Sequence, residues 1–329
     1  MKFTEVGNLA ESIYGKSLAP IRMFIETKAE AWEQESILPS VFNTQKSDSW
    51  AEKVTGLTAT DGFMPVGENG AHPHDQMQEG YSKTIEHMTW KDSFALSREI
   101  VDDGKLMDMK SRPQAFVNGF YRTREMFGAA LLGNAIQGNT SATFKGASFD
   151  CASADGLSMF NTAHTSKVSG GTQSNCFSNA FSLTALNKVQ AAMQLFKGDN
   201  GEILNVSPKT ILIPVDAALR EAVFQAIGSH EIPGQANRGN NVQMGMWNVV
   251  TWPYLNQFIT SGTSPWVLID DDYNEANGGG VWFDRVELEV TERIDNNNAL
   301  VHDGYARFGA GFADWRAFAV GGVTGGTSL

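Results

Sequence analysis

The stretch from residue 41 to residue 104 constrains the fold most, because it predicts two strands that have no core of their own. Residues 81–100 alternate in places between apolar and polar side chains, which is typical of a half-exposed strand. Before them lies a turn-rich middle that includes Asp61-Gly62 and Glu68-Asn69-Gly70. An isolated two-stranded hairpin is only marginally stable in water. We therefore expect an extended hairpin that needs another surface to lie against, and this points to a partner.

A single long helix is predicted next, over residues 111–137. Ser111 can cap its N-terminus, Pro113 is tolerated in its first turn, and Gly138 can end it. Apolar side chains form one stripe along this segment: Phe116, Phe120, Phe127 and Leu131. At a rise of about 1.5 Å per residue the helix would be roughly 40 Å long, which is long for a globular domain.

The chain is acidic, with 25 basic and 37 acidic residues and a formal net charge of -12. Such a chain is not expected to wrap nucleic acid over a broad surface, because Lys and Arg carry phosphate binding. Residues 111–182 are locally basic, with 5 basic and 3 acidic side chains. The excess comes from Arg112, Arg122 and Arg124 on the predicted helix. A solvated or salt-bridged helix face is the commoner explanation of such a set, and a nucleic-acid contact is the alternative.

The rest of the chain mixes helices and strands. Residues 1–40 contain a short amphipathic helix, which Leu38-Pro39 ends. The elements expected after the long helix are a helix from residue 184, a buried strand at 209–215, a second helix from 216 to 227, short strands at 248–252 and 266–270, and longer strands at 281–294 and from 300 towards 318. Because these elements lack βαβ regularity, the predicted fold class is α+β.

No strong catalytic motif is present: the sequence has no Gly-x-Ser-x-Gly elbow, no His-Glu-x-x-His pair and no Walker loop. Three weak candidates are His72-Pro73-His74 with Asp75 as a metal site, Asp270-Asp271-Asp272 as a Ca²⁺ or Mg²⁺ site, and His164 beside Cys151 and Cys176 as a nucleophile pair. The favoured explanations are a solvated turn, a charged strand end and a structural histidine. We therefore expect no catalytic residue, no metal, no cofactor and two free cysteines.

The hydropathy of the chain gives no sign of a membrane segment. No run approaches the ~18 uninterrupted apolar residues that a membrane span needs. The first 20 residues contain charged side chains where a signal peptide would need an apolar core. We expect a soluble protein that is made in the cytoplasm and does not contact a membrane.

Several motifs between residues 155 and 270 occur in an order that can be compared with known families. They are Asp155-Gly-Leu-Ser-Met-Phe-Asn-Thr-Ala-His164, Gly170-Gly-Thr-Gln-Ser-Asn175, a helix that begins Leu183-Thr-Ala-Leu186 and includes Met193, the strand and helix from residue 209, Val249-Val250 with Pro253, and Trp266-Val-Leu-Ile-Asp270. This series resembles the major capsid proteins of tailed bacteriophages, and most closely the Mu-like major head subunit group. The order of elements over most of the chain is also similar to the Hong Kong 97-type fold.

The resemblance implies a division of the chain. The parts would be an N-terminal arm at 1–40, an extended two-stranded loop (the E-loop) at 41–104, a peripheral domain with a spine helix at 105–183, an axial domain at 184–279, and a return to the peripheral sheet at 280–329. Subunits would form hexamers and pentamers and close an icosahedral head shell around phage double-stranded DNA. The E-loop would lie over a neighbouring subunit, and many weak contacts would then add up by multivalency.

The resemblance also implies partners. Besides other copies of the chain these would be a scaffold, a portal and decoration proteins, with assembly in the bacterial host cytoplasm and non-specific contact to packaged DNA. Arg112, Arg122 and Arg124 would face the genome or the scaffold. Some relatives carry a cleaved N-terminal scaffolding segment, whereas this sequence begins about 40 residues before the hairpin. We therefore expect a separate scaffold or an already processed form, and no covalent Lys–Asn cross-links between subunits.

Two other functions stay open at this point. An encapsulin, the shell of a bacterial nanocompartment, has the same fold and encloses an enzyme cargo. A cytosolic metal-dependent hydrolase would use His72 and His74 with distant carboxylates. Shell formation separates the first two functions from the third, and stoichiometric metal would support the third.

Overall fold

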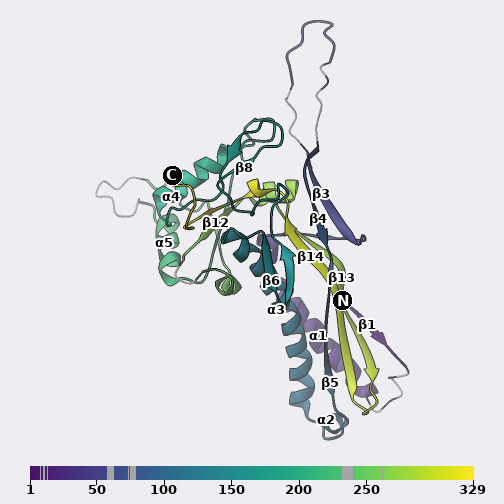
Figure 1. Ribbon diagram of the computed structural model, residues 1–329. Coiled ribbons are helices and arrows are strands. Elements are labelled where there is room, and N and C mark those ends of the chain that lie inside the picture. Colours follow the sequence, from purple (N-terminus) through teal and green to yellow (C-terminus); the bar gives the residue numbers. More distant parts are fainter. Residues whose placement is uncertain are drawn as a thin grey trace.

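The computed structural model describes residues 1–7, 9, 12, 14–57, 63–72, 74, 79–231, 240–260 and 263–329. Helices and strands are mixed, and Figure 1 shows a long limb, a compact part and a projecting hairpin. The helices are α1 (Gly15–Glu35), α2 (Arg98–Asp102), α3 (Leu106–Ile136), α4 (Leu183–Gln194), α5 (Ala217–Gly228) and α6 (Asp271–Asn277), with short 3-10 turns η2 (Leu38–Ser40), η3 (Pro253–Gln257) and η4 (Trp315–Ala317). The predicted α+β class is confirmed.

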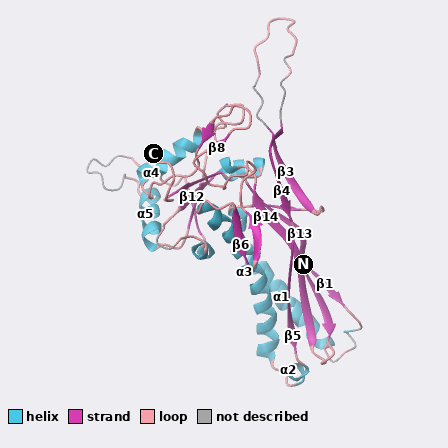
Figure 2. Cartoon of the chain, in the orientation of Figure 1, coloured by secondary structure: helices cyan, strands magenta, loops and turns pink. Residues whose placement is uncertain are grey.

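One sheet forms the long limb. Its strands are β1 (Lys2–Glu5), β13 (Gly280–Ile294), β14 (Leu300–Phe312) and β5 (Met88–Leu96) in that order, with β2 (Asn43–Lys46) paired to β13. Figure 2 shows α1 and α3 running alongside these strands. Ile21 and Ile25 of α1 share one buried cluster with Val117 of α3 and Leu300 of β14. Among the described residues β5 pairs only with β14, so its other edge is open.

The predicted long helix is α3, and it begins five residues earlier than expected, at Leu106. Ser111 therefore does not cap it, and Pro113 lies inside the helix. A proline removes one backbone hydrogen bond and crowds the preceding turn. Here tertiary packing offsets that cost, because Pro113 is buried and the following turn places Phe116 and Val117 in the core. Gly138, with a φ of 79°, follows the C-terminal end as predicted.

A second sheet forms the compact part, in the order β11 (Asn248–Thr251), β10 (Thr210–Ile213), β12 (Trp266–Ile269) and β15 (Phe318–Gly321). Every residue of β10, β12 and β15 is buried. The second half of α3 belongs to the core of this part, since Phe127 and Leu131 join the same cluster as Leu212 and Leu268. The helix α3 thus spans both parts of the molecule.

The last strand corrects one expectation. Residues 280–329 do not all return to the first sheet, because β15 pairs antiparallel with β12 of the second. Glycine makes this possible: a Cβ at Gly321 would lie 2.3 Å from the ring of Trp266. Every residue of the apolar strand β15 is buried in this position, and burial of apolar surface is the main driving force for such packing.

Three further strand pairs complete the chain. They are β3 (Ala51–Leu57) with β4 (Glu79–Glu86), β6 (Ser141–Phe144) with β7 (Ala147–Asp150), and β8 (His164–Thr165) with β9 (Thr172–Gln173). The predicted hairpin is therefore β3–β4, and the next strand, β5, leaves it to join the first sheet. No helix among the described residues is long and apolar enough to cross a membrane.

Candidate assembly surfaces

Two lysines anchor the paired strands β3 and β4, which together we call the base of the hairpin. Lys83 is buried, and its Nζ donates to the carbonyl of Ala152 at 3.0 Å and pairs with the Asp150 carboxylate at 2.5 Å. Lys167 donates from its Nζ to the carbonyls of Glu79 at 2.9 Å and Gly80 at 2.7 Å. Hydrogen bonds to charged groups stabilise by roughly 1.5–3 kcal/mol each. The direction in which the hairpin leaves the body is thus fixed by its own chain.

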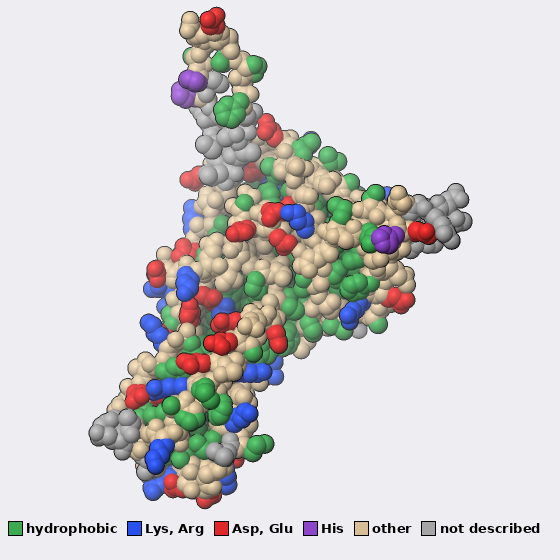
Figure 3. All heavy atoms as spheres, turned by 180° about the vertical axis from the view of Figure 1, so that it is seen from behind, with side chains coloured by type: hydrophobic (Ala, Val, Ile, Leu, Met, Phe, Trp, Pro, Cys, Tyr) green, Lys and Arg blue, Asp and Glu red, His purple; other side chains and the backbone are tan. Residues whose placement is uncertain are grey.

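Beyond this base, the described tip residues expose apolar side chains. Phe63 is fully exposed, and Met64 and Val66 are more than half exposed. A tight turn follows, in which the Gly70 amide donates to the carbonyl of Gly67 at 2.9 Å and Asn69 takes a φ of 62°. Figure 3 shows apolar side chains on this projection, away from the rest of the molecule. An exposed apolar segment on such a projection is typical of an interaction site.

The arm helix α1 is tied to the first sheet by Arg22, which pairs with two carboxylates. Arg22 donates from its Nε to the buried carboxylate of Glu292 on β13 at 3.0 Å, and from an Nη to Glu5 on β1 at 2.6 Å. His302 lies beside Glu292 and stacks on Phe94 with ring centroids 4.5 Å apart. Burial, together with the positive charge of Arg22, lowers the pKa of His302 to about 4. The histidine is therefore neutral near pH 7.

The three arginines of the basic segment do not act as one set. Arg124 is mostly buried, pairs with Asp284 at 2.9 Å and lies over the ring of Trp282 at 5.0 Å. It therefore holds α3 on β13 and is not free to contact a partner. Arg112 and Arg122 are exposed, and Arg112 donates to the carbonyl of Ala95 at 2.8 Å.

Glu125, which follows these arginines in the sequence, is buried and links three segments. Its Oε1 accepts hydrogen bonds from the Ser36 hydroxyl at 2.6 Å and the Ile37 amide at 3.1 Å. Its Oε2 accepts from the indole Nε1 of Trp252 at 2.9 Å. The carboxylate thus joins the end of α1 and the loop after β11 to the middle of α3.

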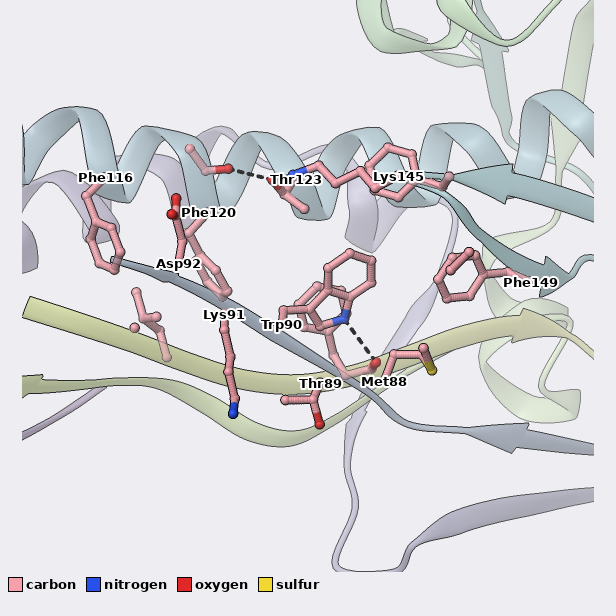
Figure 4. A pocket seen from close by; sticks show the side chains of 16 residues that line it. Met88, Thr89, Trp90, Lys91, Asp92, Phe116, Phe120, Thr123, Lys145 and Phe149 are labelled. Carbon is pink, nitrogen blue, oxygen red and sulfur yellow. Dashed lines mark hydrogen bonds between the residues drawn. The ribbon is translucent and has the colours of Figure 1, made fainter. Parts of the chain in front are cut away.

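A groove of about 450 Å³ lies between α3 and the open edge of β5, and we call it the α3–β5 groove. Figure 4 shows its walls: Trp90 comes from β5, Phe120 from α3 and Phe149 from β7. All three are only partly buried. Lys145 lies at one end, where its Nζ donates to the Thr123 hydroxyl at 3.1 Å, and Asp92 lies towards the other end.

The predicted chemical candidates have structural roles among the described residues. His164 is fully buried, bonds through its Nδ1 to the Asp155 carboxylate at 2.6 Å and stacks on Trp315. Sequence reasoning placed Asp155 near this histidine without identifying the pair. The free thiols of Cys151 and Cys176 are buried, and burial raises the pKa of Cys151 to about 11, so neither is an activated nucleophile.

The two candidate metal sites give a similar result. In Asp270-Asp271-Asp272, the first carboxylate caps α6, the second accepts from the Thr210 hydroxyl and the third pairs with Lys209. These three aspartates therefore lie at the capped start of helix α6, directly after strand β12. Of the His72–Asp75 candidate, Pro73 and Asp75 lie outside the described residues. Within the described ranges no group of three or more His, Cys, Asp or Glu could hold a metal ion.

Comparison with known proteins decides the family. A family model described as "Phage capsid protein" matches residues 80–321, about three quarters of the chain. This chain belongs to the phage capsid protein family. Its role is that of a structural protein of the phage head shell, and it associates with itself in that shell. Neither the encapsulin nor the hydrolase alternative is favoured by this match.

Solved structures agree on the fold of this capsid protein. A protein of Mycobacterium phage Patience aligns with a TM-score of 0.51 and 14% identity, over 94% of this chain and 88% of the other. A structure described as the head of Helicobacter pylori bacteriophage KHP40 aligns with a TM-score of 0.50 and 10% identity, over 85% and 87%. The Hong Kong 97-type fold is thereby confirmed, whereas the Mu-like subgroup stays a prediction. A search of the curated proteins found no match.

Proposed function

We propose that this capsid protein assembles as hexamers and pentamers into an icosahedral shell around phage double-stranded DNA, with each β3–β4 hairpin lying over a neighbouring subunit. The observation that carries the proposal is the hairpin itself. Its base is fixed to the body by Lys83 and Lys167, while Phe63 and Met64 near its tip are exposed to solvent. A monomer gains nothing from holding apolar side chains in water. A neighbouring subunit would bury them.

The proposed division of the chain follows the two sheets. Residues 1–40 form the arm, 41–104 the E-loop with β5, and 105–183 the peripheral domain around α3. Residues 184–279 form the axial domain, whose loops would point at the capsomer axis. The division differs from the expected one for residues 280–329: β13 and β14 would belong to the peripheral domain with the first sheet, and β15 to the axial domain with the second.

The further partners are a scaffold, a portal, decoration proteins and the genome, met during assembly in the host cytoplasm. The exposed Arg112 and Arg122 support a contact of α3 with DNA or scaffold, and the buried Arg124 is left out of that surface. Replacing both exposed residues with Gln should impair packaging or scaffold-directed assembly. Arg220→Gln, at another exposed arginine on α5, is the matched control. Normal, filled particles from the double variant would exclude this contact.

The assembly proposal itself is tested on the purified unmodified chain. Size-exclusion chromatography and negative-stain electron microscopy should show closed shells rather than a small oligomer, with the scaffold co-expressed if the chain alone does not close. We propose no catalytic activity, no metal and no cofactor for this protein. Stoichiometric metal in purified particles would contradict that part of the proposal.

A further inference from the structure

The α3–β5 groove is an unexplained feature of the peripheral part. Three partly exposed aromatic side chains, those of Trp90, Phe120 and Phe149, line it together. The edge of β5 beside it is unpaired among the described residues, so backbone groups are also available there. A groove with aromatic walls and a free strand edge fits an extended apolar peptide segment.

Lys145 supplies a second, independent sign of function at this groove. It takes a φ of 47° in the turn between β6 and β7, a left-handed conformation that a lysine adopts only at a cost. The next residue, Gly146, also has a positive φ, as expected for a tight hairpin turn in which Asn or Gly is preferred at Lys145's place. The conformation holds the ammonium group over the groove end, where it donates to Thr123.

We infer that this groove receives the hairpin tip of a second copy of the chain, with Phe63–Val66 against the aromatic walls and Glu68 paired with Lys145. This inference rests on the proposed assembly and adds the residues of the contact. The tip matches both the aromatic walls and the positive charge of the groove, since its four apolar residues, Phe63–Val66, are followed two positions later by the carboxylate of Glu68. Asp92 towards the opposite end of the groove disfavours the reversed orientation, in which Glu68 would meet a like charge.

The lengths of the two surfaces agree. Phe63 to Val66 spans about 10 Å when extended, at roughly 3.3 Å per residue. Phe116 and Thr123, which line the groove along α3, are seven residues apart and therefore also about 10 Å along the helix axis. The tip of the same subunit is not the occupant. Its hairpin is anchored at the base by Lys83 and Lys167 and projects away from the limb that carries the groove (Figure 1).

A disulfide test on assembled particles addresses the contact directly. Val66→Cys combined with Thr123→Cys should give a ladder of linked subunits on a non-reducing gel, because Val66 would lie beside Thr123 when Glu68 pairs with Lys145. Val66→Cys combined with Ala115→Cys is the matched control, because Ala115 is exposed on the same helix but does not line the groove. The natural cysteines are both buried, and the unmodified chain measures their background. Cross-linking of the Thr123 pair at no more than the level of the Ala115 pair overturns the inference.

A charge exchange tests the orientation. Glu68→Lys and Lys145→Glu should each raise the free-subunit concentration left at assembly about threefold, and the double exchange should restore it. Phe63→Ser should raise it about tenfold, since an exposed phenylalanine gains much from burial in an interface. Equal concentrations for all these variants would refute the contact. A failure of the proposed function is recognised separately, because then the unmodified chain forms no shells.

Discussion

The buried carboxylate of Glu125 offers the sharpest test of how α3 holds this subunit together. In Glu125→Gln one oxygen remains, and it can keep the two hydrogen bonds from Ser36 and Ile37. The new amide nitrogen must then face the indole N–H of Trp252, so that two donors meet. The variant loses one hydrogen bond to a charged acceptor and leaves a buried donor unsatisfied. Together these effects should lower the free energy of unfolding by about 2–4 kcal/mol.

The assay is urea unfolding of the dissociated subunit, followed by tryptophan fluorescence and by circular dichroism. Trp252→Phe removes the same hydrogen bond from the other side and retains most of the ring volume. In the unmodified chain it should cost about 1–3 kcal/mol, because it leaves one carboxylate oxygen with fewer donors. When Glu125→Gln is already present, Trp252→Phe should cost less than it does in the unmodified chain, by about 1 kcal/mol or more, because it removes the clash between the two donors. Additive costs, or a Glu125→Gln effect below about 0.5 kcal/mol, would refute the reasoning.

Three further predictions use the same unfolding assay. Arg124→Gln should destabilise the subunit by about 2–4 kcal/mol, because it leaves the mostly buried Asp284 without its ion pair. Arg122→Gln, at an exposed position of the same helix, should change stability by less than about 0.5 kcal/mol. Equal effects of the two substitutions would contradict the assigned roles. Gly321→Ala should cost about 2 kcal/mol or more of stability, since its methyl group would overlap the Trp266 ring. Gly119→Ala, whose methyl group meets no atom within 4 Å, should instead stabilise α3 by roughly 0.5–1 kcal/mol. If Gly321→Ala has no effect on stability, β15 does not pack as described. The pKa of His302 is about 4 in the folded chain against about 6.5 when unfolded, so the unfolded state binds a proton at a higher pH than the folded state. Stability that is present above pH 6.5 should therefore be lost as the pH falls towards 4, by up to about 3 kcal/mol. A His302→Gln variant should show a flatter profile of stability against pH, and identical profiles for the two chains would contradict the prediction.

Local chemistry explains why much of the fold could be predicted. The stripe of Phe116, Phe120, Phe127 and Leu131 identified α3. The helix predicted from residue 216 is α5, and the Asp216 side chain caps it by accepting from the amides of Ala218 and Leu219. Turn residues and alternation placed the hairpin and the long strands. Each of these signals depends on neighbours within a few positions of the chain, so the sequence alone contains it.

The contacts that define the candidate surfaces depended on residues far apart in the sequence. Nothing near Arg124 indicates that Asp284, 160 positions away, would neutralise it, and the charge count alone therefore grouped it with Arg112 and Arg122. The start of α3 was misplaced because Pro113 is a helix breaker unless the packing around it compensates, and that packing is tertiary. His164 illustrates the same point, since its stacking on Trp315 joins two segments about 150 residues apart.

The sequence by itself determined the elements, their order and, through motifs in that order, the resemblance to phage capsid proteins. Only the tertiary structure decided which charges are free, that β15 belongs to the second sheet, and that a groove opens between α3 and the edge of β5. The physical reason is that element formation follows from short-range periodicity and capping, whereas burial, ion pairing and open strand edges are properties of the packed surfaces. The hairpin illustrates this difference. Its strands and turns could be predicted from the sequence, whereas its anchored base and its exposed apolar tip could not.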